Sequence, residues 1–386
     1  MTAPQIKTSS LAAVLYAFLI VGFSDMVGFG TSYIQRDFGI GDTLSSLLPM
    51  MVFAWFLVLS IPIAMLMNRI GRKAVVQAGN LVTVAGLLIP LLRYDLGGCL
   101  AGFALIGIGN TALQVSLNPL VTTLVPASRA TSSLTAGQLM RNIASVCSPF
   151  VAAFFAAKTG HWEYMFPAYA GLTVLSLVWL QRSVPSDRSG GAPAPGLRRT
   201  MSVLADRTVL LSFGGIFCFI GCDVCINTLI PKLLIERCAE SVESAGLGSS
   251  VYFVARIAGA LIGIPVLARL SDVKYMRGNI LLTLCAAALL LPAASHAAIM
   301  TLAALLGFSL SCTFSTVYAV AMRHLPERSN EISGVMIMAI CGGAVLPLLM
   351  NGLTEAVKSS AGGVVAVLLC VCYLLYYAFR INIHEK

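Results

Sequence analysis

The chain is poor in charged residues. Only 11% of its 386 residues are Asp, Glu, Lys or Arg, whereas 58% are hydrophobic, and the mean hydropathy is +0.88. A soluble domain carries about 25% charged residues, roughly twice this fraction. The shortage argues against a soluble globular protein and predicts a polytopic membrane protein surrounded by lipid.

Histidine and nucleotide-binding motifs are also scarce. The chain has 4 histidines, all in predicted loops or tails, and it contains no glycine-rich P-loop sequence. We therefore expect no enzyme and no bound cofactor, and ATP-driven transport has no support. The 11 cysteines fall mostly in apolar segments, where Cys behaves as a small apolar residue, so we expect no metal site.

Hydropathy predicts the fold class, because about 17–25 apolar residues are needed to cross a bilayer as a helix. Twelve candidate spans lie near residues 11–34, 44–67, 75–92, 97–124, 133–157, 164–180, 208–231, 247–268, 279–294, 297–322, 332–353 and 362–379. The prediction is an all-α membrane protein with 12 transmembrane helices in two six-helix bundles.

The net charge of +9 reflects membrane topology. With both termini in the cytoplasm, the inner loops and tails hold 17 Lys and Arg residues and the outer loops hold 6. This is the positive-inside bias. We expect a multi-pass protein of a bacterial cytoplasmic (inner) membrane, a monomer whose partners are the lipid bilayer and a small-molecule solute, with no nucleic acid.

The segment 183–206 is rich in Gly, Pro, Ser and Arg, which is typical of a linker. It separates a predicted N-terminal bundle, residues 1–182, from a predicted C-terminal bundle, residues 207–386. Both bundles carry Gly and Asp at matching depth in their first span. Such internal repeats are common in transporters, whose solute site lies between the repeats.

Two acids, Asp25 and Asp223, lie deep within apolar spans. Each lies about 21 Å into a hydrocarbon layer about 30 Å thick. Because a charge at that depth is costly, such residues usually mark an ion or substrate path. We predict both as proton-coupling residues, with the proton as the coupling ion.

The loop after the second span reads Ala64-Met-Leu-Met-Asn68-Arg69-Ile-Gly71-Arg72-Lys73. It resembles the G-x-x-x-D-R-x-G-R-K signature of the major facilitator superfamily, with Ala and Asn replacing the first Gly and the Asp. The resemblance implies alternating access, in which these basic residues brace helix ends in one conformation. A loop that only satisfies the positive-inside bias is the alternative.

Three further segments resemble the fucose permease-like sugar–proton symporters of that superfamily. They are Gly107 to Pro119, Val254-Ala-Arg256-Ile-Ala-Gly259, and Gly342-Gly343-Ala344-Val-Leu-Pro347. The resemblance implies gating or structural roles for Arg256, Gly342 and Gly343. Gln114 stands where the family has a proton-coupling Glu, and Gly22 stands where it has an Asn. Coupling would therefore depend on Asp25, with or without Asp223, and an uncoupled uniporter remains an alternative.

Polar side chains recur at helical spacing within the spans. The predicted substrate-binding residues are Gln114, Asn118, Gln138, Arg141, Asn142, Asn227 and Tyr318. Amides in apolar helices also join helices to one another, which is the structural alternative for each of them.

Arg141 and Arg256 are the two cations predicted within spans. Each could pair with an intramembrane Asp, and Arg141 could instead bind a carboxylate or phosphate of the substrate. The predicted function is secondary active transport of a small polar solute, a neutral or anionic sugar or sugar derivative, by proton-coupled symport. A proton-coupled drug or metabolite exporter, an uncoupled uniporter and a non-transporting membrane sensor are the alternatives.

Overall fold

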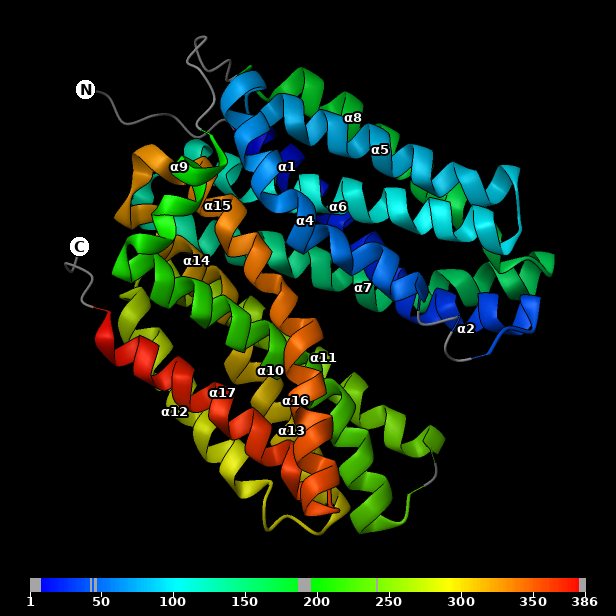
Figure 1. The fold of residues 1–386 in the computed structure, drawn as a ribbon, viewed down its shortest axis with the longest axis vertical. Coiled ribbons are helices and arrows are strands. Elements are labelled where there is room, and N and C mark those ends of the chain that lie inside the picture. The colour runs from blue at the N-terminus through cyan, green and yellow to red at the C-terminus, as the bar shows by residue number, and fades with distance from the viewer. Residues whose placement is uncertain (1–7, 42–43, 45–46, 187–195, 241, 382–386) are drawn as a thin grey trace. The chain divides into compact units, whose positions relative to one another are not determined.

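The computed structural model describes residues 8–41, 44, 47–186, 196–240 and 242–381, which are helical and contain no strand (Figure 1). The α-helices are α1 (Thr8–Phe23), α2 (Val27–Phe38), α4 (Leu47–Ile70), α5 (Arg72–Leu92), α6 (Leu96–Leu124), α7 (Ala130–Thr159), α8 (Met165–Ser183), α9 (Leu197–Met201), α10 (Arg207–Cys238), α11 (Val242–Leu267), α12 (Asp272–Leu289), α13 (His296–Leu310), α14 (Thr313–His324), α15 (Ser329–Met338), α16 (Gly342–Val357) and α17 (Ala361–Arg380). Short 3-10 turns are η1 (Ser24–Met26), η2 (Ala127–Arg129), η3 (Trp162–Tyr164), η4 (Ser202–Ala205), η5 (Pro326–Arg328) and η6 (Ala339–Cys341). The all-helical prediction is confirmed.

Ten segments of the described chain are long and apolar enough to cross a membrane. The sixth and ninth predicted spans correspond to α8 and α12, which are not among these ten segments. The ninth span was placed too late, because α12 starts at Asp272 and not at residue 279. The first turns of α12 carry Asp272, Lys274 and Arg277, whose charges hid the start of the helix from hydropathy.

The chain forms two compact units. Unit 1 contains Met1–Ala127, Gly137–Val203 and Glu327–Met338, and unit 2 contains Ser128–Ala136, Leu204–Pro326 and Ala339–Lys386. The start of α7 thus packs within unit 2, and α15 packs within unit 1. Residues 187–195 of the predicted linker lie outside the described residues. The last part of the predicted linker contains α9 and η4. The predicted bundle boundaries stay a prediction.

Helices within unit 1 approach closely through glycine. A Cβ on Gly86 of α5 would lie 2.8 Å from the carbonyl oxygen of Gly102 on α6, and a Cβ on Gly102 would lie 2.8 Å from that of Gly86. In Figure 1, α5 and α6 accordingly run side by side. Small residues allow such backbone contact between membrane helices, where van der Waals packing drives association.

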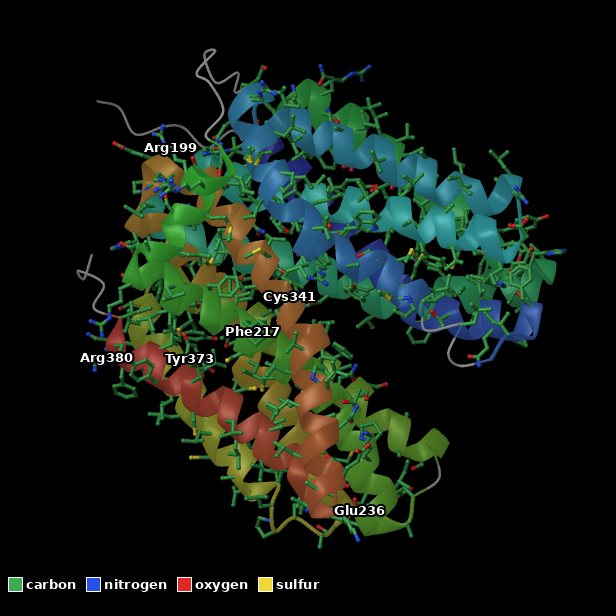
Figure 2. The ribbon with its side chains drawn as sticks, viewed as in Figure 1. Arg199, Phe217, Glu236, Cys341, Tyr373 and Arg380 are labelled. Carbon is green, nitrogen blue, oxygen red and sulfur yellow. The ribbon has the colours of Figure 1, made fainter. Side chains whose placement is uncertain are left out.

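Glycine has the same packing role in unit 2, at a position predicted to be structural. A Cβ on Gly342 would lie 2.2 Å from the carbonyl oxygen of Phe217 on α10. Figure 2 labels Phe217 and Cys341, the residue before Gly342, at this contact. Gly343 faces Ile220 on the same helix, with 3.0 Å between its ideal Cβ and the Ile220 Cγ2. The Gly342-Gly343 pair therefore seats α16 against α10.

A hydrogen-bonded cluster lies beyond the first span, at the end of α2 in unit 1. The Tyr94 hydroxyl and the Trp162 indole donate to Asp37 Oδ2 over 2.7 and 3.0 Å. Arg36 forms an ion pair with the same carboxylate at 3.0 Å. Burial alone would raise the pKa of Asp37, but these hydrogen bonds and the charge of Arg36 hold the pKa below its usual value.

This cluster predicts a loss of stability in acid. Because the folded-state pKa of Asp37 is lowered, its contribution is present above the unfolded pKa of about 3.9 and is lost as pH falls through the folded value. At neutral pH, Asp37→Asn should lower the thermal unfolding midpoint by roughly 2–4 °C, equivalent to about 1 kcal/mol. The difference between variant and parent should shrink at the acid limit. A difference that stays constant down to that limit would contradict the assignment.

Candidate functional site

The first span tightens into a 3-10 turn at its acid, while the backbone stays right-handed helical on both sides. α1 ends at Phe23, η1 holds Asp25, and α2 begins at Val27. Asn110 of α6 donates its amide to the Ser24 hydroxyl over 2.7 Å, and that hydroxyl donates to the Val21 carbonyl over 2.8 Å. The turn therefore holds Ser24, the residue before Asp25, against α6.

Asp25 is bound by two residues of α7. Arg141 donates Nη2 to Oδ1 over 3.1 Å and Nε to Oδ2 over 3.3 Å, and the Ser145 hydroxyl donates to Oδ2 over 2.5 Å. The Asp25 and Arg141 side chains are 26% and 20% exposed. The two charges therefore neutralise each other, and neither side chain is fully buried. Of the two interpretations of Arg141, the structure shows the ion pair with Asp25. Ser145, which donates a further hydrogen bond to Asp25, was not predicted.

The pair depends on a close approach of α1 to α7 at Gly22. A Cβ on Gly22 would lie 2.4 Å from the carbonyl oxygen of Arg141 and 2.6 Å from the Cβ of Ala144. No side chain fits there without a shift of the backbone. The Gly at a position where the resembling family has Asn is thus explained by packing against α7.

Gly22→Ala should weaken the Asp25–Arg141 pair. The added methyl group must push α1 and α7 apart, and overpacking of this kind costs about 1–3 kcal/mol. The measurement is thermal unfolding of the purified variant. Gly171→Ala in α8 is the matched control, because a Cβ there meets nothing within 4 Å. Equal stability of the two variants would rule out the close approach.

Three amides on α6 share one helix face, because Asn110, Gln114 and Asn118 are each four residues apart. Gln114 is only 2% exposed, yet neither its Nε2 nor its Oε1 has a hydrogen-bond partner among the described residues. Asn118 donates to the Gln114 carbonyl over 2.7 Å, and its Oδ1 is also unpartnered in the described chain. Unsatisfied buried amides are rare and costly, so this face suits a polar ligand or water.

The remaining predicted residues of α7, Gln138 and Asn142, lie at i−3 and i+1 from Arg141 and are half-buried. Neither side chain forms a hydrogen bond with another described residue. Within unit 1 the structure thus pairs Asp25 with Arg141 and places Asn110 of α6 on Ser24, the residue before Asp25.

Unit 2 contains a second paired acid. Arg256 Nη1 contacts Asp223 Oδ1 at 2.5 Å, and the buried Tyr252 hydroxyl donates to the same oxygen. The Arg256 guanidinium also lies 5.5 Å from the centre of the Phe219 ring. Sequence reasoning missed Tyr252, although it lies four residues before Arg256 and so on the same face of α11.

The other two predicted binding residues of unit 2 differ in their surroundings. Asn227 lies one turn after Asp223, and its Oδ1 is buried without a partner among the described residues. Tyr318 is fully buried and stacks on Phe314 with 5.7 Å between ring centres. In this structure Tyr318 is part of the packing around α14.

The loop with the superfamily signature binds the start of α15. Gly71 adopts φ +87°, a region that favours glycine, and so turns the chain from α4 into α5. Arg72 donates over 2.7 Å to both Asn330 Oδ1 and Ser329 Oγ. Asn68 accepts from the Asn330 amide over 2.7 Å.

The two remaining basic residues of that loop are placed differently from Arg72. Lys73 donates to the carbonyls of Gln181 and Val184, near the end of α8. The side chain of Arg69 is exposed.

A comparable arrangement in unit 2 was not predicted. Asp272, 4% exposed at the start of α12, accepts from Thr131 Oγ1 at 2.9 Å and forms an ion pair with Arg323. Both α7 and α15 start after a Pro-containing segment and a 3-10 turn, and both are held by the first residues of another helix. Hydropathy could not indicate this contact, because the predicted ninth span began after Asp272 and left that residue in a loop.

Comparison with known proteins agrees with this architecture. The model of the Major Facilitator Superfamily matches residues 13–348 and 213–383. The chain is 24% identical over 362 residues to a glucose/galactose transporter of Brucella abortus, covering 89% of this chain and 87% of that one. It is 22% identical over 399 residues to a putative glucose/galactose transporter of Helicobacter pylori, covering 97% of each.

Among solved structures, a variant of the Escherichia coli fucose:proton symporter FucP superposes with a TM-score of 0.87 at 16% identity. The match covers 98% of this chain and 100% of that one, and at this identity it shows a shared fold. Together with the family match along most of the sequence, it confirms the resemblance read from the signature loop. The chain belongs to the Major Facilitator Superfamily of membrane transporters.

Proposed function

We propose that this protein imports a sugar or sugar derivative together with protons, by alternating access. The observation that carries the proposal is Asp25, an ionisable group in a 3-10 turn of the first span, which is 26% exposed and bound by Arg141. The similarity to glucose/galactose transporters supports a sugar as the solute.

Protonation of Asp25 is the coupling step of this proposal. A carboxylate binds the Arg141 guanidinium through two charged hydrogen bonds, whereas a neutral carboxyl group loses most of that attraction. Proton entry therefore frees Arg141 and the Ser145 hydroxyl for other contacts. Release of the proton on the opposite side restores the pair and resets the site.

Sugar hydroxyls would be bound by the amides that lack protein partners. Gln114 can both donate and accept, and Asn118 Oδ1 can accept. Gln138 and Asn142 are the predicted binding residues on α7. In unit 2, the predicted binding residue Asn227 has a buried Oδ1 without a partner among the described residues. Asp223 remains a candidate for a second coupling residue, with Arg256 and Tyr252 compensating its charge.

Helix starts that are held by the other half of the sequence are the proposed gating contacts. The start of α15 is bound by Arg72, and the start of α7 is bound by Asp272. Both contacts must break and re-form as the transporter changes conformation. We place the protein in a bacterial inner membrane as a monomer with both termini cytoplasmic, as the charge bias indicates.

Reconstitution into proteoliposomes tests this function. An inward proton gradient of one pH unit should drive about tenfold accumulation of a transported sugar for each coupled proton. Glucose and galactose are the first solutes to try, and a protonophore should abolish accumulation. Equilibration that ignores the gradient would indicate a uniporter, and proton-driven efflux would indicate an exporter.

A further inference from the structure

We infer that the transported solute carries a carboxylate, which replaces Asp25 on Arg141 when Asp25 is protonated. This inference rests on the proposed function and names the class of its substrate as sugar acids of the hexuronate type.

The site is already a carboxylate receptor, and its present occupant belongs to the protein. Arg141 Nε and Nη2 bind the two oxygens of Asp25, and Ser145 Oγ donates a third hydrogen bond. A guanidinium fork with a hydroxyl beside it is the donor set that recognises carboxylates on ligands. The Asp25 carboxylate thus stands in for the carboxylate of a substrate.

Charge balance favours an acidic solute. Protonation of Asp25 leaves the cation of Arg141, only 20% exposed, without a counter-charge. A neutral sugar cannot compensate this charge, whereas a substrate carboxylate can, so proton and anion binding strengthen each other. The proton goes to Asp25, the anion goes to Arg141, and the net charge of the site is unchanged. Release of both lets the Asp25–Arg141 pair re-form.

No other described carboxylate competes for Arg141 in this arrangement. The elements packed on η1, together with α7, otherwise carry these titratable or charged residues: Tyr16 on α1, Tyr33, Arg36 and Asp37 on α2, Cys99 on α6, and Cys147 and Lys158 on α7. Asp37 is committed to Tyr94, Trp162 and Arg36.

Arg256 differs from Arg141 in how firmly it is held. Its guanidinium lies over the Phe219 ring and on Asp223, and its side chain is 12% exposed. Arg141 has no aromatic ring against it in the described structure, and its Nη1 makes no hydrogen bond to a described residue. Gln138 and Asn142 flank it on α7, where they can bind the hydroxyls next to a sugar carboxylate. Arg141 is therefore the cation available to a ligand.

Matched sugars test the inference on the purified full-length protein. Binding of galacturonate and of galactose is measured by thermal shift and by titration calorimetry at about pH 5.5 and pH 7.5, where the galacturonate carboxyl stays ionised. Galacturonate should bind roughly tenfold more tightly at the lower pH, the effect of gaining one charged hydrogen-bonded pair. Galactose should bind more weakly than galacturonate at the lower pH.

Variants separate the roles of the two charges. Asp25→Asn frees Arg141 permanently, so galacturonate should bind at neutral pH as tightly as it binds the parent in acid. Arg141→Gln should weaken galacturonate binding at least about tenfold and weaken galactose binding much less. Glu163→Gln, which removes a carboxylate paired with His161 outside the site, is the charge-matched control and should match the parent.

The outcomes distinguish this inference from the proposed function. Binding of galactose with no binding of galacturonate, or galacturonate binding that Arg141→Gln leaves unchanged, overturns the anionic substrate and leaves sugar symport standing. Galacturonate affinity that does not respond to Asp25→Asn overturns the exchange of carboxylates. Failure of the parent to bind or transport either class of sugar overturns both proposals.

Discussion

Asp25→Asn should abolish proton-driven accumulation while leaving downhill movement of the solute intact. Asn is close to Asp in size and keeps a hydrogen-bonding side chain, but it cannot bind or release a proton. Under an inward gradient of one pH unit, the parent should accumulate solute about tenfold for each proton, and the variant should only equilibrate. The measurement is uptake of labelled solute into proteoliposomes with and without the gradient.

Two comparisons make this result specific to the coupling site. Glu163→Gln should accumulate solute like the parent, because it removes a carboxyl group outside the site. Counterflow exchange without a gradient should remain active in Asp25→Asn, which shows that the variant is folded and conducts solute. Accumulation at the parental level in Asp25→Asn would remove Asp25 from the coupling mechanism.

The second large effect concerns the buried acid at the start of α12. Arg323→Leu leaves the Asp272 carboxylate, 4% exposed, without the cation that compensates it. Removing one partner of a buried ion pair costs about 3–5 kcal/mol, because the remaining charge stays desolvated. The purified variant should therefore unfold at a clearly lower temperature than the parent and should express poorly.

A double variant distinguishes the unpaired charge from simple loss of packing. Asp272→Asn combined with Arg323→Gln removes both charges and keeps both side chains near their original size. It should recover most of the stability, because no uncompensated charge remains. If the double variant is as unstable as Arg323→Leu, the pair does not stabilise unit 2 through its charges.

The helical fold was predictable because its signal is local. A span needs only a run of apolar residues, and a scarcity of charge over the whole chain is visible without any partner. The ninth span shows the limit of that signal. Hydropathy placed the start of α12 in a loop because that start is charged. The charge of Asp272 is compensated by Arg323, a distant residue in the sequence, and hydropathy does not detect such a contact.

The sequence singled out the two acids of the candidate site but did not assign the residues that pair with them. Asp25 and Asp223 stand out because an acid in an apolar span is costly wherever the chain folds. Their partners could not be assigned, because Arg141 is 116 residues from Asp25 in the chain, whereas Arg256 is 33 residues from Asp223. Nothing in the sequence indicated that Gly22 makes room for α7, or that Ser145 and Tyr252 complete the two sites.

The sequence alone therefore determined which ionisable residues lie within membrane spans, where a charge has a high free-energy cost. That cost depends only on the type of residue and its depth in the span. Only the tertiary structure decided which opposite charge compensates each acid, and which amides of α6 are left without a partner. Those are properties of packing between helices, and they depend on backbone approaches such as that of Gly22 to Arg141, which no periodicity within one helix records.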